Sequence, residues 1–292
     1  MDGFLNINKP KGLTSFDVIR KLRKILKIRK MGHSGNLDPG ATGVLVIGVN
    51  KGTRFLEYIF NLEKEYVATI QLGILTDTLD MDGNILEEKE VPTITQSELE
   101  AVLEEFIGEI EQVPPSYSAI KKEGKRLYEL AREGVFVVPK ARKVYIHSIE
   151  LLEFNRDSFK IKVVCSSGTY IRSLARDIAI RFNTYGCVKN LVRTRIGHFK
   201  IENSIDLQNE EKIKKALIPV GEGLSFMASV TITNNSSFYF RNGNRVPQSA
   251  IIKRSHDARS FSLVRVFDQS GDFLGVGMLK WDGVYPKKVL TS

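Results

Sequence analysis

The chain has 292 residues, of which 42% are hydrophobic and 26% are charged, an ordinary composition for a folded protein of one large domain or two. Its formal net charge of +9 favours a polyanionic partner, either nucleic acid or an anionic membrane surface. No apolar run approaches the roughly 18 residues of a membrane span, and the N-terminus lacks a signal-peptide pattern. The two cysteines, Cys165 and Cys187, show no metal-type spacing, so we expect a reduced, cytoplasmic protein that does not insert into a membrane.

The first two thirds of the chain combine helical and strand-like patterns. A helix is expected after Thr14, because Thr14 and Asp17 form a capping pattern and the apolar residues that follow recur at helical spacing. Because helices and strands alternate irregularly, with hairpin-like pairs, we predict an α+β fold with a mixed or antiparallel sheet. The predicted strands span residues 43–49, 65–73, 144–154 and 159–166, and the predicted helices span residues 96–107, 125–133 and 169–182.

The character of the sequence changes near residue 219. The segment IPVGEGLSFMAS, residues 218–229, resembles a linker. Short alternating runs follow at residues 229–233, 260–267 and 273–281, separated by the turn signals NGN and QSGD. We therefore expect a first domain over residues 1–220 and a small C-terminal β-barrel domain over residues 228–292.

Three signatures of metal or nucleotide chemistry can be tested and rejected. GVLVIGVNK has glycines at P-loop spacing, but Val49 and Asn50 stand where that loop needs a lysine and a hydroxyl. DTLDMDGN resembles a calcium loop, but placing Gly83 at its sixth position puts Lys89 where the bidentate carboxylate belongs. The zinc pattern of base deaminases is absent as well. The sequence therefore indicates no metal site.

Positive charge is concentrated in residues 115–145, which carry eight basic and three acidic side chains. Three tyrosines, Tyr117, Tyr128 and Tyr145, are interleaved with them. Such a mixture suits nucleic acid, because the cations neutralise phosphates and the aromatic rings can stack on bases. A solvated helix with its tyrosines in the core explains the segment equally well.

A turn-rich stretch, MGHSGNLDPGATGVL at residues 31–45, directly precedes an apolar run and carries one histidine and one aspartate. GHSGNLDPGATGVL resembles the G-H-x-G-x-L-D-P-x-A-x-G-V-L motif of the TruB family, the bacterial tRNA pseudouridine synthases. Asn36 and Gly40 depart from the residues most frequent there, and neither change removes a functional group. The resemblance continues in order through residues 7–15, 64–83, 113–134, 165–177 and 191–197, and RNGNRV at 241–246 stands where a PUA domain is expected.

The resemblance implies a pseudouridine synthase catalytic domain over residues 1–220, an RNA-binding insertion at about 113–145 and a PUA domain over 228–292. It implies that uridine 55 in the T loop of tRNA becomes pseudouridine. The bond from the ribose to N1 of uracil breaks and C5 bonds to the ribose instead, an isomerisation that requires no cofactor. The expected partner is the T arm of tRNA, bound by a monomer without protein partners. The alternative is a non-catalytic tRNA-binding protein or RNA chaperone.

The resemblance also implies roles for residues of a nucleotide pocket. Asp38 matches the essential aspartate, which can act as a nucleophile or take a ribose proton. Arg172 matches the arginine that pairs with this aspartate, and Tyr66 matches the tyrosine that packs on the target uracil. Tyr170 and Leu191 match further pocket residues. Without the resemblance, each has an ordinary structural interpretation as a turn, surface or core residue.

Other matched residues would contact the RNA outside the pocket. His33 matches the residue that takes the place of the flipped-out uridine, although a histidine between glycines is ordinarily a loop residue. Arg54 and Asp80 fall at positions where the family contacts or arranges RNA. The basic insertion would close on the T arm through Lys121, Lys125, Arg126, Arg132 and Arg142.

Overall fold

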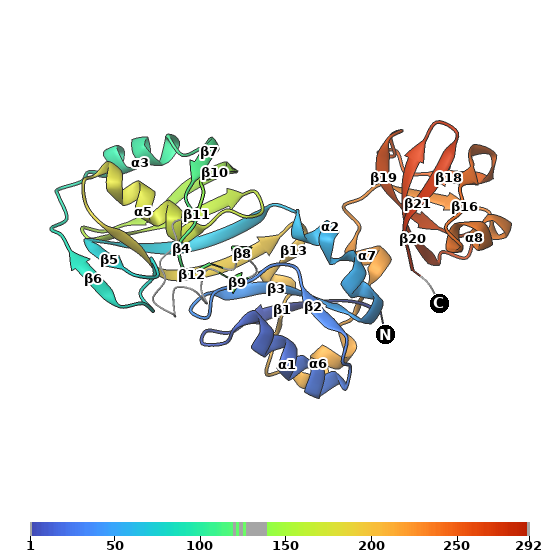
Figure 1. The fold of residues 1–292 in the computed structure, drawn as a ribbon, viewed down its shortest axis with the longest axis horizontal. Helices are drawn as coiled ribbons and strands as arrows, with labels where there is room; N and C mark the ends of the chain where they lie inside the picture. The colour runs from blue at the N-terminus through green and yellow to red at the C-terminus, as the bar shows by residue number, and fades with distance from the viewer. Residues whose placement is uncertain (1, 119–120, 123–124, 127–138, 291–292) are drawn as a thin grey trace.

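The computed structural model describes residues 2–118, 121–122, 125–126 and 139–290. Figure 1 shows a larger body built on one long, twisted sheet and a smaller, barrel-like body formed by the C-terminal residues. The described part of the chain contains no helix that is long and apolar enough to cross a membrane.

An eleven-stranded mixed sheet is the centre of the larger body. Its strands are β1 (Gly3–Lys9), β2 (Met31–His33), β3 (Thr42–Val49), β4 (Lys64–Leu72), β7 (Gly108–Gln112), β10 (Arg142–Phe154), β11 (Ser158–Cys165), β12 (Gly186–Ile196), β13 (Phe199–Lys200), β14 (Ile205–Asp206) and β15 (Ile218–Pro219). The main path runs β14-β1-β3-β12-β4-β11-β10-β7, and the β1–β14 and β3–β12 pairs are parallel. The predicted α+β class, mixed sheet and four long strands are confirmed.

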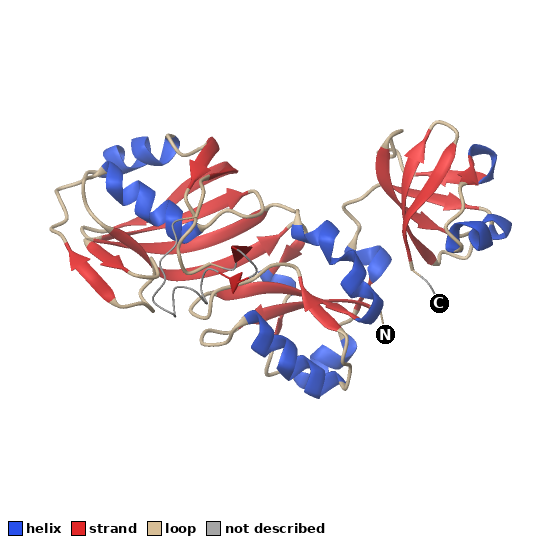
Figure 2. Ribbon diagram, viewed as in Figure 1, coloured by secondary structure: helices blue, strands red, loops and turns tan. Residues whose placement is uncertain are grey.

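Helices cover the two halves of this sheet. α1 (Ser15–Leu26) begins with the predicted cap, in which Thr14 and Asp17 bond to each other's backbone N–H, and it buries Val18 and Leu22 against β1 and β3. In Figure 2, α1 lies beside one half of the sheet, and α3 (Gln96–Glu104) and α5 (Ile171–Arg181) lie over the other half. Shorter helices of the larger body are α2 (Leu56–Phe60), α6 (Glu210–Lys215) and α7 (Val220–Gly223), with 3₁₀ turns η1 (Asn50–Phe55) and η2 (Ile201–Asn203).

Two small hairpins lie outside the main sheet. β5 (Ile74–Thr76) pairs with β6 (Ile85–Glu88), and β8 (Lys121–Lys122) pairs with β9 (Lys125–Arg126). The helix predicted at residues 125–133 is therefore wrong at its start. Lys121 pairs with Arg126 and Lys122 with Lys125 in this short ladder, and residues 127–133 lie outside the described part of the chain.

The C-terminal residues form a six-stranded barrel-like sheet, which confirms the predicted small β-barrel. Its order is β17-β21-β20-β19-β16-β18. Phe240, from α8 (Asn234–Arg241), packs into its apolar core beside Val264. The strands are β16 (Ser229–Ile232), β17 (Val246–Pro247), β18 (Ile251–Arg254), β19 (Ser262–Phe267), β20 (Phe273–Lys280) and β21 (Gly283–Val289), with a 3₁₀ turn η3 (Gln248–Ala250).

Residues 218–229 are not the free linker that their composition predicts. Val220 and Leu224 are buried in an apolar cluster that also contains Phe4 of β1 and Val276 of β20. Arg265 of β19 donates from Nε to the carbonyl of Met227 at 2.9 Å and from NH1 to that of Gly221 at 3.0 Å. The segment's few apolar side chains therefore join the two sheets, a contact that local composition does not reveal.

Candidate active site

Asp38 lies on the turn between β2 and β3, and the neighbouring backbone is held from the loop that precedes α1. The backbone N–H of Leu37 donates to Oγ of Ser15 at 2.9 Å, and the N–H of Gly12 donates to the carbonyl of Pro39 at 2.8 Å. Leu37 itself is buried in the core. The carboxylate is therefore presented from an anchored backbone, with its side chain 34% exposed.

Lys9, at the end of β1, also holds the turn that carries Asp38, through a hydrogen bond to Pro39. Its side chain is fully buried, and Nζ donates to the carbonyls of Leu13 at 2.7 Å, Pro10 at 3.0 Å and Pro39 at 3.2 Å. Burial lowers the pKa of Lys9 to about 8, although the nearby Asp38 carboxylate opposes that shift. Sequence reasoning assigned Lys9 no role, and a lysine at the end of a strand with the apolar residues Phe4, Leu5 and Ile7 was the available signal.

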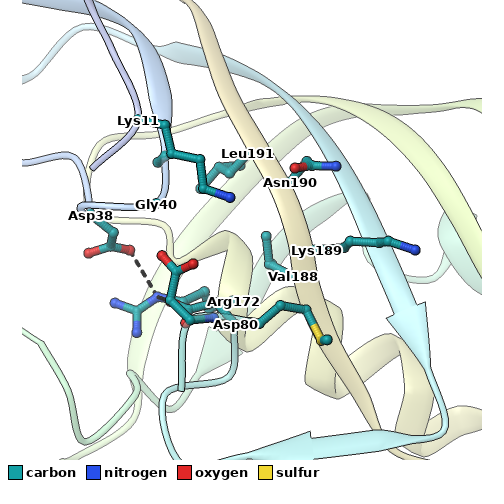
Figure 3. A pocket seen from close by; sticks show the side chains of 12 residues that line it. Lys11, Asp38, Gly40, Asp80, Arg172, Val188, Lys189, Asn190 and Leu191 are labelled. Carbon is teal, nitrogen blue, oxygen red and sulfur yellow. Dashed lines mark hydrogen bonds and ion pairs between the residues drawn. The ribbon is translucent and has the colours of Figure 1, made fainter. Parts of the chain in front are cut away.

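Arg172 joins Asp38 to a second carboxylate. Its Nε lies 2.9 Å from Oδ2 of Asp38 and 3.7 Å from Oδ2 of Asp80 (Figure 3). Its NH1 and NH2 donate to the carbonyls of Thr78 at 2.7 Å and Tyr117 at 3.0 Å, so every nitrogen of the guanidinium is used. Burial raises the pKa of Asp80, while the Thr78 hydroxyl and Arg172 oppose that rise. Asp80 thus belongs to the Asp38 site itself.

A cleft of about 860 Å³ opens over Asp38. Tyr66 of β4 lies in the wall of this cleft and is 7% exposed. Burial raises the pKa of the Tyr66 hydroxyl. The cavity lies within the size range of sites for small organic molecules. A smaller pocket shares Asp38, Asp80 and Leu191 with this cleft and is also lined by Lys11 (Figure 3). The cleft brings together the predicted pocket residues His33, Asp38, Tyr66, Tyr170, Arg172 and Leu191.

The predicted RNA contacts are distributed differently. Arg142 lines the cleft, where its guanidinium lies 4.6 Å from the centroid of the Tyr170 ring and donates to the carbonyl of Gly168. Arg54 lies elsewhere and donates from NH1 to the carbonyl of Val289 at 3.0 Å, so it joins the larger body to β21. The side chains of the remaining predicted contacts lie outside the described part of the structure: Lys121, Lys125, Arg126 and Arg132.

Sequence reasoning missed two buried cations in the cleft wall, Lys64 of β4 and Arg193 of β12. Lys64 is 5% exposed and donates from Nζ to the carbonyls of Phe60 and Leu62, each at 2.8 Å. Burial lowers its pKa to about 8. Among the described residues, no carboxylate pairs with either cation. Basic residues at inward positions of apolar strands were the signal that could have found them.

The geometry suits chemistry on a nucleotide. A carboxylate that a buried guanidinium holds in place is a directed nucleophile or general base. The ring of Tyr66 offers a face on which a base can stack, and Leu191 supplies an apolar wall. The Arg172 guanidinium and the carboxylates of Asp38 and Asp80 therefore lie together at the floor of a cleft whose sides are largely aromatic and apolar.

Residues 23–171 match the model of the TruB family pseudouridylate synthase (N terminal domain), and residues 228–290 match that of pseudouridine synthase II TruB, C-terminal. The tRNA pseudouridine synthase B of Clostridium tetani is 41% identical over 293 residues, which cover 100% of both chains. That of Clostridium kluyveri is 42% identical over 282 residues, or 96% of each chain. A chain in a structure of an H/ACA RNP bound to a substrate RNA containing 2′-deoxyuridine is 25% identical, with a TM-score of 0.78 and coverage of 99% of this chain and 85% of that one. The chain belongs to the TruB family of pseudouridylate synthases.

Proposed function

We propose that this protein isomerises uridine 55 in the T loop of tRNA to pseudouridine, after the target nucleotide is flipped into the cleft. The observation that carries this proposal is the Asp38 carboxylate, 2.9 Å from Arg172 at the floor of a cavity that can accommodate a nucleotide. The names of the relatives at about 40% identity support tRNA as the substrate. The position of Asp38 within the cleft supports base flipping, because a base that stays stacked in its loop would be held away from the carboxylate.

In this reaction the bond between N1 and C1′ breaks and a bond between C5 and C1′ forms. C5 loses a proton and N1 gains one, so the product contains the same atoms as the substrate. Asp38 attacks the sugar or the base as a nucleophile, or removes a ribose proton as a base. Arg172 holds the carboxylate in a fixed direction, while Tyr66 stacks on the uracil and Leu191 excludes water from one side. Tyr170 adds a hydroxyl at the edge of the pocket.

The proposed partner is the T arm of tRNA, and the net charge of +9 supports binding to a polyanion. Residues 1–220 would supply catalysis, residues 113–145 would close on the T arm and residues 228–292 would act as the PUA domain. Arg142, which lines the cleft, could contact the RNA backbone near the flipped nucleotide. We propose that a monomer in the cytoplasm carries out the reaction without a protein partner.

Incubation of the purified protein with unmodified tRNA, followed by mass mapping of the modified position, tests this function. A tRNA with cytidine at position 55 is the matched control and should remain unchanged. Asp38→Asn should abolish turnover while tRNA affinity stays within about tenfold of wild type, since the amide keeps the shape but cannot supply the carboxylate. Binding without turnover by the wild-type protein would favour the non-catalytic alternative, and near-normal turnover by Asp38→Asn would contradict the assignment of Asp38.

A further inference from the structure

Arg193 occupies a central position beneath the cleft. It lies on β12 and is paired in register with Tyr66 on β4 and with Gly43 on β3. Its side chain is 1% exposed, and it donates from Nε to the carbonyl of Val44 at 2.8 Å and from NH1 to that of Asn36 at 3.1 Å. Asn36 stands two residues before Asp38, so this arginine links the catalytic turn to the strand that follows it.

The guanidinium of Arg193 is incompletely paired. Its NH2 nitrogen is buried and has no hydrogen-bond partner in the described structure, and no described carboxylate forms an ion pair with it. Buried charged donors are nearly always satisfied, because an unpaired one loses its hydration without compensation. Arg172, by contrast, uses all three of its nitrogens. Arg193 therefore retains a charge and a donor that the packing of the fold alone does not explain.

The charge of Arg193 acts on three titratable side chains, Lys9, Lys64 and Tyr66, of which only Tyr66 can accept a hydrogen bond from a guanidinium in its usual charge state. Burial raises the pKa of the Tyr66 hydroxyl, and the charge of Arg193 is the largest effect that opposes this rise, whereas Cys165 and Asp38 raise the pKa further. Both Tyr66 and Arg193 line the cleft.

We infer that Arg193 is a positioning residue for the proposed reaction, which holds the turn of Asp38 and the hydroxyl end of Tyr66 in one arrangement. It fixes the turn through the carbonyl of Asn36. Its spare N–H donates to the Tyr66 hydroxyl oxygen when the nucleotide is bound, so the ring is held flat against the uracil. Because Arg193 is closed to solvent, it acts through these two groups and makes no contact with RNA phosphates. The inference rests on the function proposed above.

Three variants test this role in the full chain. Arg193→Met removes the charge and the hydrogen-bond donors. Arg193→Lys keeps the charge but lacks the planar guanidinium and its several N–H groups. Arg265→Met is the matched control, because Arg265 also donates from Nε and NH1 to two backbone carbonyls but lies away from the cleft. Each variant is compared with wild type by thermal midpoint, tRNA affinity and single-turnover rate, at a temperature where all four proteins are folded.

Arg193→Met should lower the single-turnover rate by about 100-fold, the scale of loss when a reacting group is misplaced by about 1 Å. Its tRNA affinity should stay within about threefold of wild type, and Arg193→Lys should recover about tenfold of the lost rate. Arg265→Met should shift the thermal midpoint without changing the rate. A rate for Arg193→Met equal to that of Arg265→Met, or a loss confined to tRNA affinity, would overturn the inference.

A second measurement does not depend on activity. In protein labelled with 3-fluorotyrosine, the ¹⁹F signal of Tyr66 is assigned by its loss in Tyr66→Phe. In wild type, addition of tRNA should change the chemical shift of this signal. In Arg193→Met, the chemical shift should already differ from wild type without tRNA, and addition of tRNA should change it little. Arg265→Met should leave it in place. An unchanged Tyr66 signal in Arg193→Met contradicts the inference, whereas an inactive wild type with the expected signals would contradict only the proposed function.

Discussion

Replacement of Lys9 by methionine should change how the stability of the protein depends on pH. Lys9 is fully buried, and its pKa is lowered from 10.5 to about 8, chiefly by burial. Between these values the unfolded chain keeps a proton that the folded protein has released. Unfolded protein thus binds more protons, so this group makes the free energy of unfolding rise with pH across the window from about 8 to 10.5.

The size of the effect follows from the shift. Each pKa unit corresponds to about 1.4 kcal/mol, so a shift from 10.5 to about 8 amounts to about 3 kcal/mol. Below pH 8 the folded protein carries this cost in full, and above pH 10.5 the cost is gone. Methionine does not titrate, so the free energy of unfolding of Lys9→Met should lack the increase between about pH 8 and 10.5. At pH 7 it should still be less stable than wild type by about 1–3 kcal/mol, because the three hydrogen bonds that Lys9 donates to the carbonyls of Leu13, Pro10 and Pro39 are lost.

Urea unfolding at a series of pH values from 7 to 10.5 measures both effects. Exposed Lys214→Met is the control for loss of one positive charge. The stability difference between wild type and Lys9→Met should grow by about 3 kcal/mol over the window, while the difference from Lys214→Met stays nearly constant. Parallel curves for wild type and Lys9→Met would refute the reasoning. Since Lys9 holds the carbonyl of Pro39, Lys9→Met should also lower the single-turnover rate at pH 7.

Two further predictions concern the RNA. His33→Ala should slow single turnover about 30-fold on intact tRNA, because unstacking the target base there costs a few kcal/mol. On a short RNA with a disordered loop the loss should be less than about threefold. Equal losses on the two RNAs would make His33 a candidate for the chemistry. Simultaneous replacement of four basic residues of the insertion by alanine should reduce the slope of log tRNA affinity against log salt concentration by about three. An unchanged slope would show that these side chains contact no phosphate. These four residues are Lys121, Lys125, Arg126 and Arg132.

Local sequence patterns determined much of the fold and pointed to the turn that carries Asp38. Alternating or continuous apolar residues were enough to place β3, β4, β10 and β11, because side-chain direction along a strand has a period of two. The capping pattern at Thr14 located the start of α1. Asp38 and its neighbours were identified by motif, since the turn is encoded within a few consecutive residues.

Only the tertiary structure decided which groups meet in the cleft. β12 lies between β3 and β4, and this order places Leu191 and Arg193 beside Asp38 and Tyr66. Local periodicity carries no information on strand order, which depends on how apolar faces pack across the whole domain. For the same reason the burial of Lys9, the convergence of Asp80 on Arg172 and the packing of residues 218–229 were not predicted. Each depends on contacts between segments far apart in the chain.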